Sequence, residues 1–139
     1  MSVRGASLYV EGTAEKDGQT KHFAWAFDTD TRYSHCDTTI DAKSGETGRA
    51  QLTIHGDHLV YDDLFSETPN VAFQLIADAD ADQDGEITEA ELQATDIRTQ
   101  ARYQVGSTGI TDLWRFIRFQ STSVGHIDGE GHCEVTRQP

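Results

Sequence analysis

The chain has 139 residues and a mass of 15.4 kDa, the size of one domain that can bury a hydrophobic core. Hydrophobic residues make up 36% and charged residues 25%, a composition typical of folded proteins rather than of disordered chains. A net charge of −13 repels nucleic-acid phosphates and anionic membranes, and no apolar run reaches the about 18 residues of a membrane-spanning helix. We therefore expect neither nucleic-acid binding nor membrane insertion.

Residues 1–61 are predicted to be rich in β-structure. Segments 8–11 and 22–27 flank a turn-prone Asp-Gly pair, and aromatic residues alternate along the second segment, which indicates a β-hairpin. Residues 37–48 are polar and contain two glycines, as is typical of a surface loop. Alternating apolar residues then predict a further strand over 49–55.

Residues 62–125 are predicted to be the helical part. A Thr-Pro pair begins a helix over 69–79, and a Thr-x-x-Glu capping box begins a second helix over 88–95. A third helix, 111–120, carries an aromatic stripe that we interpret as core. The last segment, 126–139, returns to turn and strand-like sequence. The 139 residues thus predict a single α+β domain: antiparallel β-hairpins, an inserted helix-loop-helix unit and a short C-terminal return.

The loop of that helical unit, residues 80–91, carries oxygen-bearing side chains at alternate positions. It reads Asp-Ala-Asp-Gln-Asp-Gly-Glu-Ile-Thr-Glu-Ala-Glu. Calcium takes about six to eight oxygen ligands, and alternate carboxylates converge on one point where the chain turns sharply. Gly85 lies where that turn falls. The stretch resembles the calcium-binding loop of the EF-hand family at each informative position.

This resemblance implies that Ca²⁺ is a cofactor and implies its ligands. They are the carboxylates of Asp80, Asp82 and Asp84, the backbone carbonyl of Glu86, Thr88 directly or through water, and a bidentate carboxylate from Glu91. The resemblance covers only this loop and its flanking helices. EF-hands commonly pair, and the sequence contains no second loop, which favours a structural or extracellular calcium site over a cooperative switch. The alternative is an acidic, solvated loop.

Four of the six histidines fall in two short segments of the sequence. In the first, Gly56 and Asp57 can form a two-residue hairpin turn, which would make His55 and His58 an opposed cross-strand pair. This hairpin pairing would place the neighbouring apolar residues on the opposite face of the strands from the two histidines, so both imidazoles would point away from the core. Opposed imidazoles on a rigid hairpin can hold one Zn²⁺ or Cu²⁺.

The second histidine segment can complete such a site. His126 or His132 would supply a further imidazole, with Asp57 or Asp128 as a carboxylate ligand or as its hydrogen-bonded neighbour. The alternative is that the first two histidines are surface or hydrogen-bonding residues, and that Asp57 caps a helix starting at His58. The sequence leaves both interpretations open.

The two cysteines, Cys36 and Cys133, match neither a CxxC redox motif nor a structural zinc pattern. They are either two unrelated thiols of a cytosolic protein or a disulfide that closes a loop of about 100 residues in an exported one. The acidic composition and the calcium motif favour the disulfide. We therefore expect a secreted or periplasmic domain whose signal peptide has been removed.

No enzyme signature is present: there is no GxSxG, no P-loop and no HExxH. The first hypothesis is a non-catalytic exported metal-binding protein, with one Ca²⁺ and a Cu²⁺ or Zn²⁺ site formed by histidines. The second is a small zinc-dependent hydrolase in which His55, His58 and a C-terminal histidine hold the metal and Asp57 or Asp128 is the general base. The third is a calcium-stabilised adhesion or assembly module with an exposed apolar patch.

Overall fold

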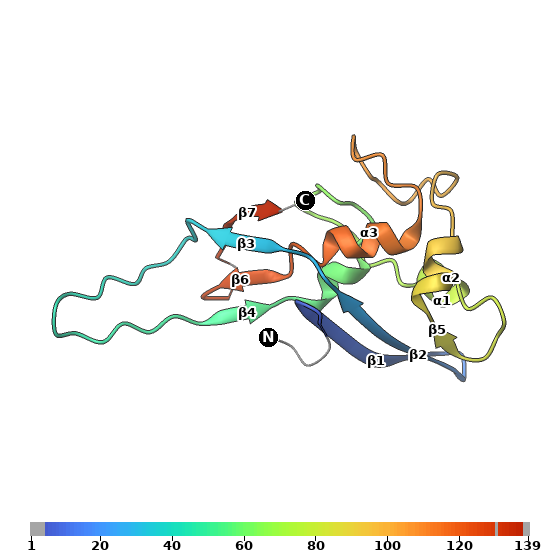
Figure 1. Ribbon diagram of the computed structural model, residues 1–139, viewed down its shortest axis with the longest axis horizontal. Coiled ribbons are helices and arrows are strands. Elements are labelled where there is room, and N and C mark those ends of the chain that lie inside the picture. The colour runs from blue at the N-terminus through green and yellow to red at the C-terminus, as the bar shows by residue number, and fades with distance from the viewer. Residues whose placement is uncertain (1–4, 130, 138–139) are drawn as a thin grey trace.

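The computed structural model describes residues 5–129 and 131–137 (Figure 1). Strands come first and last along these residues, and the short helices lie in the middle of the chain with one short strand among them. In chain order the elements are β1 (Leu8–Lys16), β2 (Gln19–Phe27), β3 (Thr31–Ser34), β4 (Leu52–Ile54), the 3-10 helix η1 (Gly56–Val60), α1 (Gln74–Asp78), β5 (Glu86–Ile87), α2 (Glu89–Ala94), α3 (Leu113–Gln120), β6 (Gly125–Ile127) and β7 (Glu134–Arg137). This mixture confirms the predicted α+β class.

The predicted N-terminal hairpin is present and consists of β1 and β2. The two strands pair antiparallel, with Leu8 opposite Phe27 at the open end. Asp17 and Gly18 connect them with φ angles of 53° and 75°. Positive φ at both central residues matches the right-handed twist of the strands, which is why an Asp-Gly pair in this position specifies the turn.

Strand β5 extends this hairpin into a three-stranded sheet in the order β1-β2-β5. It pairs with β2 in parallel and places His22 opposite Glu86 and Phe23 opposite Ile87. Trp25 strengthens the junction, because its indole Nε1 donates a hydrogen bond to the Ile87 carbonyl at 2.9 Å. Both residues of β5 belong to the predicted calcium loop, so the hairpin and that loop are joined.

The hydrophobic core contains residues of β2 and of α3. Leu113, Phe116 and Ile117 of α3 are each at most 1% exposed. The ring of Trp114 stacks on that of Phe27 with their centroids 5.0 Å apart. The aromatic stripe of the third predicted helix is therefore core, as expected.

The first predicted helix is shorter than the sequence indicated. Helix α1 begins at Gln74 instead of residue 69, because the preceding segment pairs with the end of η1 and with Tyr61 after it: the Ala72 amide donates to the Val60 carbonyl at 2.7 Å. Helix α2 corresponds to the predicted helix 88–95 and begins with the expected capping box. In the described part of the chain, no helix has the length and apolarity needed to cross a membrane.

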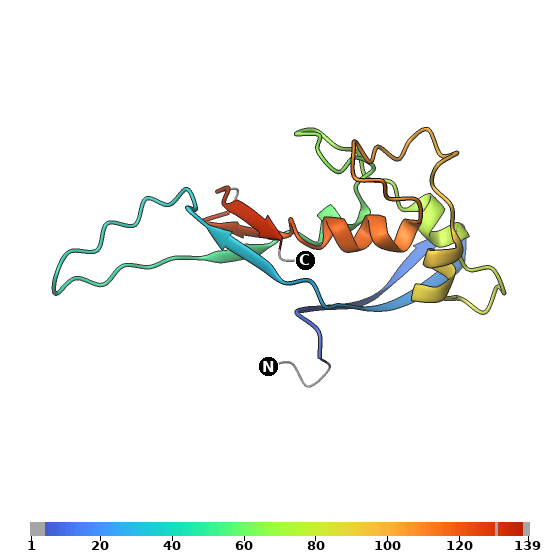
Figure 2. The same ribbon diagram turned by 45° about the horizontal axis from the view of Figure 1, so that its top comes forward.

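The C-terminal segment forms two small two-stranded sheets, in which β3 pairs with β7 and β4 pairs with β6. The predicted strand-like return is thus present, although residues 130, 138 and 139 lie outside the described residues. Between β3 and β4 the chain extends as a long loop away from the rest of the molecule, in both views (Figures 1 and 2). A disulfide joins Cys36, at the start of this loop, to Cys133 in the segment before β7, as predicted.

Candidate metal-binding sites

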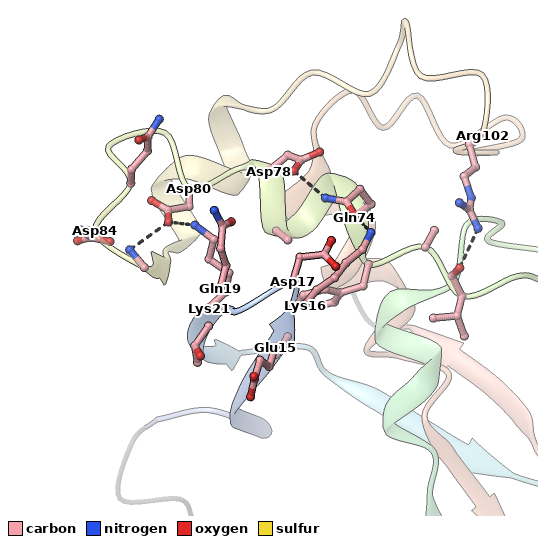
Figure 3. A pocket seen from close by; sticks show the side chains of 18 residues that line it. Glu15, Lys16, Asp17, Gln19, Lys21, Gln74, Asp78, Asp80, Asp84 and Arg102 are labelled. Atoms are coloured by element: carbon pink, nitrogen blue, oxygen red, sulfur yellow. Dashed lines mark hydrogen bonds and ion pairs between the residues drawn. The ribbon is translucent and has the colours of Figure 1, made fainter.

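The predicted calcium loop connects α1 to α2 beside the turn of the N-terminal hairpin (Figure 3). One carboxylate oxygen from each of Asp80, Asp82 and Asp84 lies within 4.8 Å of the other two. Gln83 and Gly85 adopt left-handed φ angles of 62° and 90°, which turn the chain sharply around these oxygens. The three aspartates that the sequence singled out therefore converge.

Backbone amides of the loop hold these carboxylates in place. The Gly85 amide donates to Asp80 Oδ2 at 3.0 Å, and the Asp84 amide donates to Asp82 Oδ1 at 3.3 Å. The Glu86 amide donates to Asp84 Oδ1 at 2.7 Å. Each aspartate thus keeps one oxygen bound to the loop itself, which fixes its orientation before any ion binds.

Glu91 reaches back over the loop from α2. Its Oε1 accepts from the Ala81 amide at 2.9 Å, and its Oε2 accepts from the Thr88 amide at 2.9 Å and hydroxyl at 2.8 Å. The Thr88 amide and hydroxyl lower the pKa of Glu91, while the negative charge of Asp80 opposes that shift. Glu91 is therefore an ionised carboxylate close enough to Asp80 for their charges to repel.

Asp80 is the buried member of the group, and its side chain is 0% exposed. Its Oδ2 accepts from the Lys21 ammonium as well as from the Gly85 amide, and the hydrogen bond from Lys21 holds the pKa of Asp80 below its usual range. Its Oδ1 is buried and has no hydrogen-bond partner among the described residues. A buried carboxylate oxygen without a donor is costly unless a cation compensates it.

A second group of candidate ligands consists of His55, His58 and His126. One ring nitrogen of each lies within 4.8 Å of the other two. The ring centroids are 4.4 Å apart between His55 and His126, 5.1 Å between His58 and His126, and 5.6 Å between His55 and His58. We call these three residues the histidine cluster. His126 is buried and the other two are half-buried.

The predicted hairpin between His55 and His58 is wrong. Residues Gly56–Val60 form η1, and β4 pairs instead with β6, where Thr53 lies opposite His126. The apolar residues Leu52 and Ile54 are 82% and 64% exposed, so the face that the sequence assigned to the core faces outward. The turn of η1 and the strand β6 bring the imidazoles together, with no cross-strand pair between His55 and His58.

The hydrogen-bond partners of two imidazoles determine which nitrogen is available to a metal. His55 Nε2 lies 3.3 Å from the Gly129 carbonyl, which only accepts, so Nε2 carries a proton and Nδ1 is the nitrogen that could ligate a metal. His58 Nδ1 lies 3.2 Å from the Ser123 hydroxyl. Because that hydroxyl donates to the Gln120 carbonyl at 2.8 Å, it accepts from His58 Nδ1, which leaves the Nε2 lone pair exposed to a metal.

Electrostatics favours the neutral form of His58. Burial is the largest effect on the pKa of His58 and lowers it below the ordinary 6.5. His126 and, to a smaller extent, His55 act in the same direction, and Asp57 and Ser123 oppose them. A neutral imidazole is the form that binds metals. The site therefore presents a deprotonated nitrogen at neutral pH.

The remaining predicted site residues lie at the edge of the histidine cluster or outside it. His132 is exposed, and its ring centroid is 5.5 Å from that of His126. Asp57 accepts a 2.5 Å hydrogen bond from the Tyr61 hydroxyl, which lowers the Asp57 pKa. Asp128 accepts from the Thr38 hydroxyl and the Gln51 amide, so it ties the long loop to the end of β6.

Sequence reasoning missed the residues that orient the ligands. Lys21 contacts the predicted calcium loop from another element. Ser123 and Gly129 contact His58 and His55, which lie 65 and 74 positions away in the sequence. Their residue types and spacing carry no metal signature. In comparisons with known proteins, no family model, no curated protein and no solved structure matches the chain.

Proposed function

We propose that the protein is a non-catalytic, exported metal-binding domain that holds one Ca²⁺ in the loop 80–91 and one Cu²⁺ or Zn²⁺ at the histidine cluster. The observation that carries this proposal is the convergence of two chemically different ligand groups, three carboxylates and three imidazoles, each within 4.8 Å. Carboxylates suit a hard cation such as Ca²⁺, whereas imidazoles suit Cu²⁺ and Zn²⁺.

For calcium, the proposed ligand set has both anchored and available oxygens. Asp80, Asp82 and Asp84 each have one oxygen held by a loop amide, and Asp80 Oδ1 is buried without a hydrogen-bond donor. The Glu86 carbonyl, Thr88 and a bidentate Glu91 would complete the set that the EF-hand resemblance implies.

For the transition metal, the hydrogen bonds of the imidazoles support the assignment. Gly129 and Ser123 act as hydrogen-bond acceptors that orient His55 and His58, the kind of contact that tunes metal-ligating histidines in proteins. His126 supplies the third nitrogen, and His132 is a nearby fourth donor.

Export is supported by the disulfide between Cys36 and Cys133 together with the acidic composition. Disulfides persist in oxidising compartments, which include the bacterial periplasm and the extracellular space. Calcium binding fits the same compartments, because weakly binding calcium modules operate extracellularly.

A zinc-dependent hydrolase is the second candidate, and the observation that favours it is that three imidazoles leave a coordination position open. The hydrogen bonds of the two candidate general bases argue against it. One oxygen of Asp57 accepts from the Tyr61 hydroxyl, and the two oxygens of Asp128 accept from the Thr38 hydroxyl and the Gln51 backbone amide, so both candidate general bases already have hydrogen-bond partners in the protein.

The test is elemental analysis of tag-free protein prepared without chelator and supplied with calcium, copper and zinc together. We expect one calcium ion and one copper or zinc ion per chain. The double variant His55→Ala, His58→Ala should lose the transition metal and keep calcium. The matched control is His22→Ala, His35→Ala, which removes two histidines that lie outside the histidine cluster.

Three outcomes would change the proposal. Calcium alone would remove the transition-metal site and leave the adhesion or assembly module, for which exposed Leu52 and Ile54 supply an apolar surface. Copper or zinc alone would remove the calcium site. A transition metal whose bound water exchanges with added anions, together with turnover of a test ester, would favour the hydrolase.

A further inference from the structure

We infer that Lys21 is a built-in counter-ion of the calcium loop: its ammonium group stands in for part of the charge of Ca²⁺ in the metal-free protein, and it thereby weakens calcium binding. The inference rests on the proposed calcium site and adds the residue that regulates it. Two independent observations carry it, a cation that contacts Asp80 from outside the loop and a buried Asp80 oxygen without a hydrogen-bond partner.

The contact between Lys21 and Asp80 is shielded from solvent. The Lys21 ammonium pairs with Asp80 Oδ2, and the two side chains are 19% and 0% exposed (Figure 3). Screening by salt and water, which makes most surface ion pairs weak, is small for such a pair. The metal-free loop therefore already contains one neutralised carboxylate.

The hairpin fixes the position of Lys21 independently of any ion. Lys21 belongs to β2, and the adjacent His22 amide donates to the Gly85 carbonyl at 2.7 Å. Further along the same strand, Trp25 donates to Ile87. EF-hands commonly pair with a second loop, which this sequence lacks. In this protein strand β2 pairs with the proposed calcium loop through β5, and Lys21 of that strand contacts the buried carboxylate of Asp80.

Among the described residues that line the cleft beside the loop, no other basic side chain has this role. Three basic side chains line the cleft of about 1090 Å³ that adjoins the loop, namely Lys16, Lys21 and Arg102. Lys16 donates to the Gln74 side chain at 2.7 Å, and Arg102 pairs with Asp62 at 3.2 Å. Among the described residues that line this cleft, only Lys21 contacts a carboxylate of the loop.

The two oxygens of Asp80 would serve two cations at once when calcium binds. Oδ2 is already bound to Lys21 and Gly85, so the buried Oδ1 is the oxygen that is available to Ca²⁺. Once Ca²⁺ neutralises the carboxylate, the attraction between Lys21 and Asp80 falls and the ammonium repels the ion. Lys21 thus stabilises the metal-free state more than the calcium-bound state, and by linkage it lowers calcium affinity.

The experiment compares Lys21→Met with the matched control Lys16→Met, which removes the same charge from the same hairpin. Calcium affinity is measured by isothermal titration calorimetry, and melting temperature with and without calcium is measured by circular dichroism. We expect Lys21→Met to bind calcium about tenfold more tightly, to melt at a lower temperature without calcium, and to gain more from calcium than wild type. Lys16→Met should match wild type in all three.

The outcomes separate this inference from the calcium site itself. If wild type binds no calcium, the proposed site fails. If wild type binds calcium and Lys21→Met binds it equally or more weakly, Lys21 is only a structural contact and the inference is overturned. A Lys21→Met protein that folds only with calcium supports it. Failure of both Lys21→Met and Lys21→Gln to fold in saturating calcium overturns it, because calcium must be able to replace the ammonium.

Discussion

The proposed calcium loop and the histidine cluster bring their candidate ligands together in opposite ways. The loop takes its carboxylates from one continuous stretch, 80–91, in which the backbone turn at Gly85 brings alternate side chains together. The cluster takes its imidazoles from the end of β4, from η1 and from β6, which meet only in the folded protein. A ligand set encoded locally depends on local backbone geometry, whereas a dispersed one depends on the tertiary contacts that join its segments.

The two sites also lie in different parts of the molecule. The predicted calcium loop lies near the hairpin turn at one end of the molecule, and the long loop between β3 and β4 extends from the other end (Figures 1 and 2). The histidine cluster lies on the disulfide side, because its β6 strand leads into the segment that contains Cys133. Changes in one region should therefore affect one metal and spare the other.

Removing the disulfide should have the largest effect and should affect the histidine cluster. Cys36→Ser, Cys133→Ser removes the covalent link at the base of the long loop, at a cost of about 2–5 kcal/mol in the free energy of unfolding. The freed segment includes Gly129, whose carbonyl orients His55. We expect lower urea stability and a weaker transition-metal site, measured by denaturation and metal titration, with calcium affinity unchanged. An equal loss of affinity for both metals would mean that the two regions fold as one unit.

Acidification should separate the two sites by their ligand chemistry. The pKa of His58 lies below 6.5 because of burial, so its folded form is neutral, and stability from this group is present above that value and lost as pH falls. The pKa values of Asp80 and Glu91 lie below 3.8 and 4.5, owing chiefly to Lys21 and Thr88, so both stay ionised further into acid. At a pH of about 5, therefore, protons should displace the transition metal and leave calcium bound.

Elemental analysis after dialysis at each pH measures this separation directly. Release of both metals over the same pH range would contradict it, because carboxylates with lowered pKa values cannot be protonated alongside imidazoles. If copper or zinc stays bound at a pH well below the range in which imidazoles become protonated, its ligands are groups other than imidazole.

Ser123→Ala should have a smaller effect and should lower the affinity for the transition metal about 10-fold to 100-fold, because the hydroxyl that accepts from His58 Nδ1 is lost. The matched control is Ser121→Ala. Ser121 also lies just after α3 and donates to a backbone carbonyl, that of Arg118 at 2.7 Å, and this hydrogen bond of its hydroxyl is with α3 and not with the histidine cluster. Calorimetric titration with zinc should separate the two variants. Equal affinities would show that the Ser123 hydroxyl does not orient His58.

The sequence predicts local patterns correctly and long-range contacts poorly, which is the same difference that separates the two sites. The hairpin turn, the Thr88 capping box and the spaced carboxylates are local patterns, and the structure contains each of them. The histidines were identified as a group, but the predicted hairpin at Gly56 was wrong, because the pairing of β4 with β6 is a long-range contact that residue alternation cannot reveal. Lys21 was unpredictable for the same reason: its partner lies 59 positions away.

Gly85→Ala should have the smallest effect and should affect only the calcium loop. Gly85 has a φ of +90°, and a Cβ there would meet no atom closer than the Thr20 carbonyl oxygen at 3.7 Å, so the cost is backbone strain of about 1–2 kcal/mol and not a collision. Gly109→Ala is the matched control, because its φ is +70° and its surroundings are open.

Both variants should lose similar urea stability. Only Gly85→Ala should also bind calcium more weakly, by up to about tenfold, because the metal-free loop can relax its strained turn and the calcium-bound loop cannot. Zinc affinity should stay unchanged in both, and a weaker zinc site in Gly85→Ala would show that strain in the local site spreads to the dispersed one.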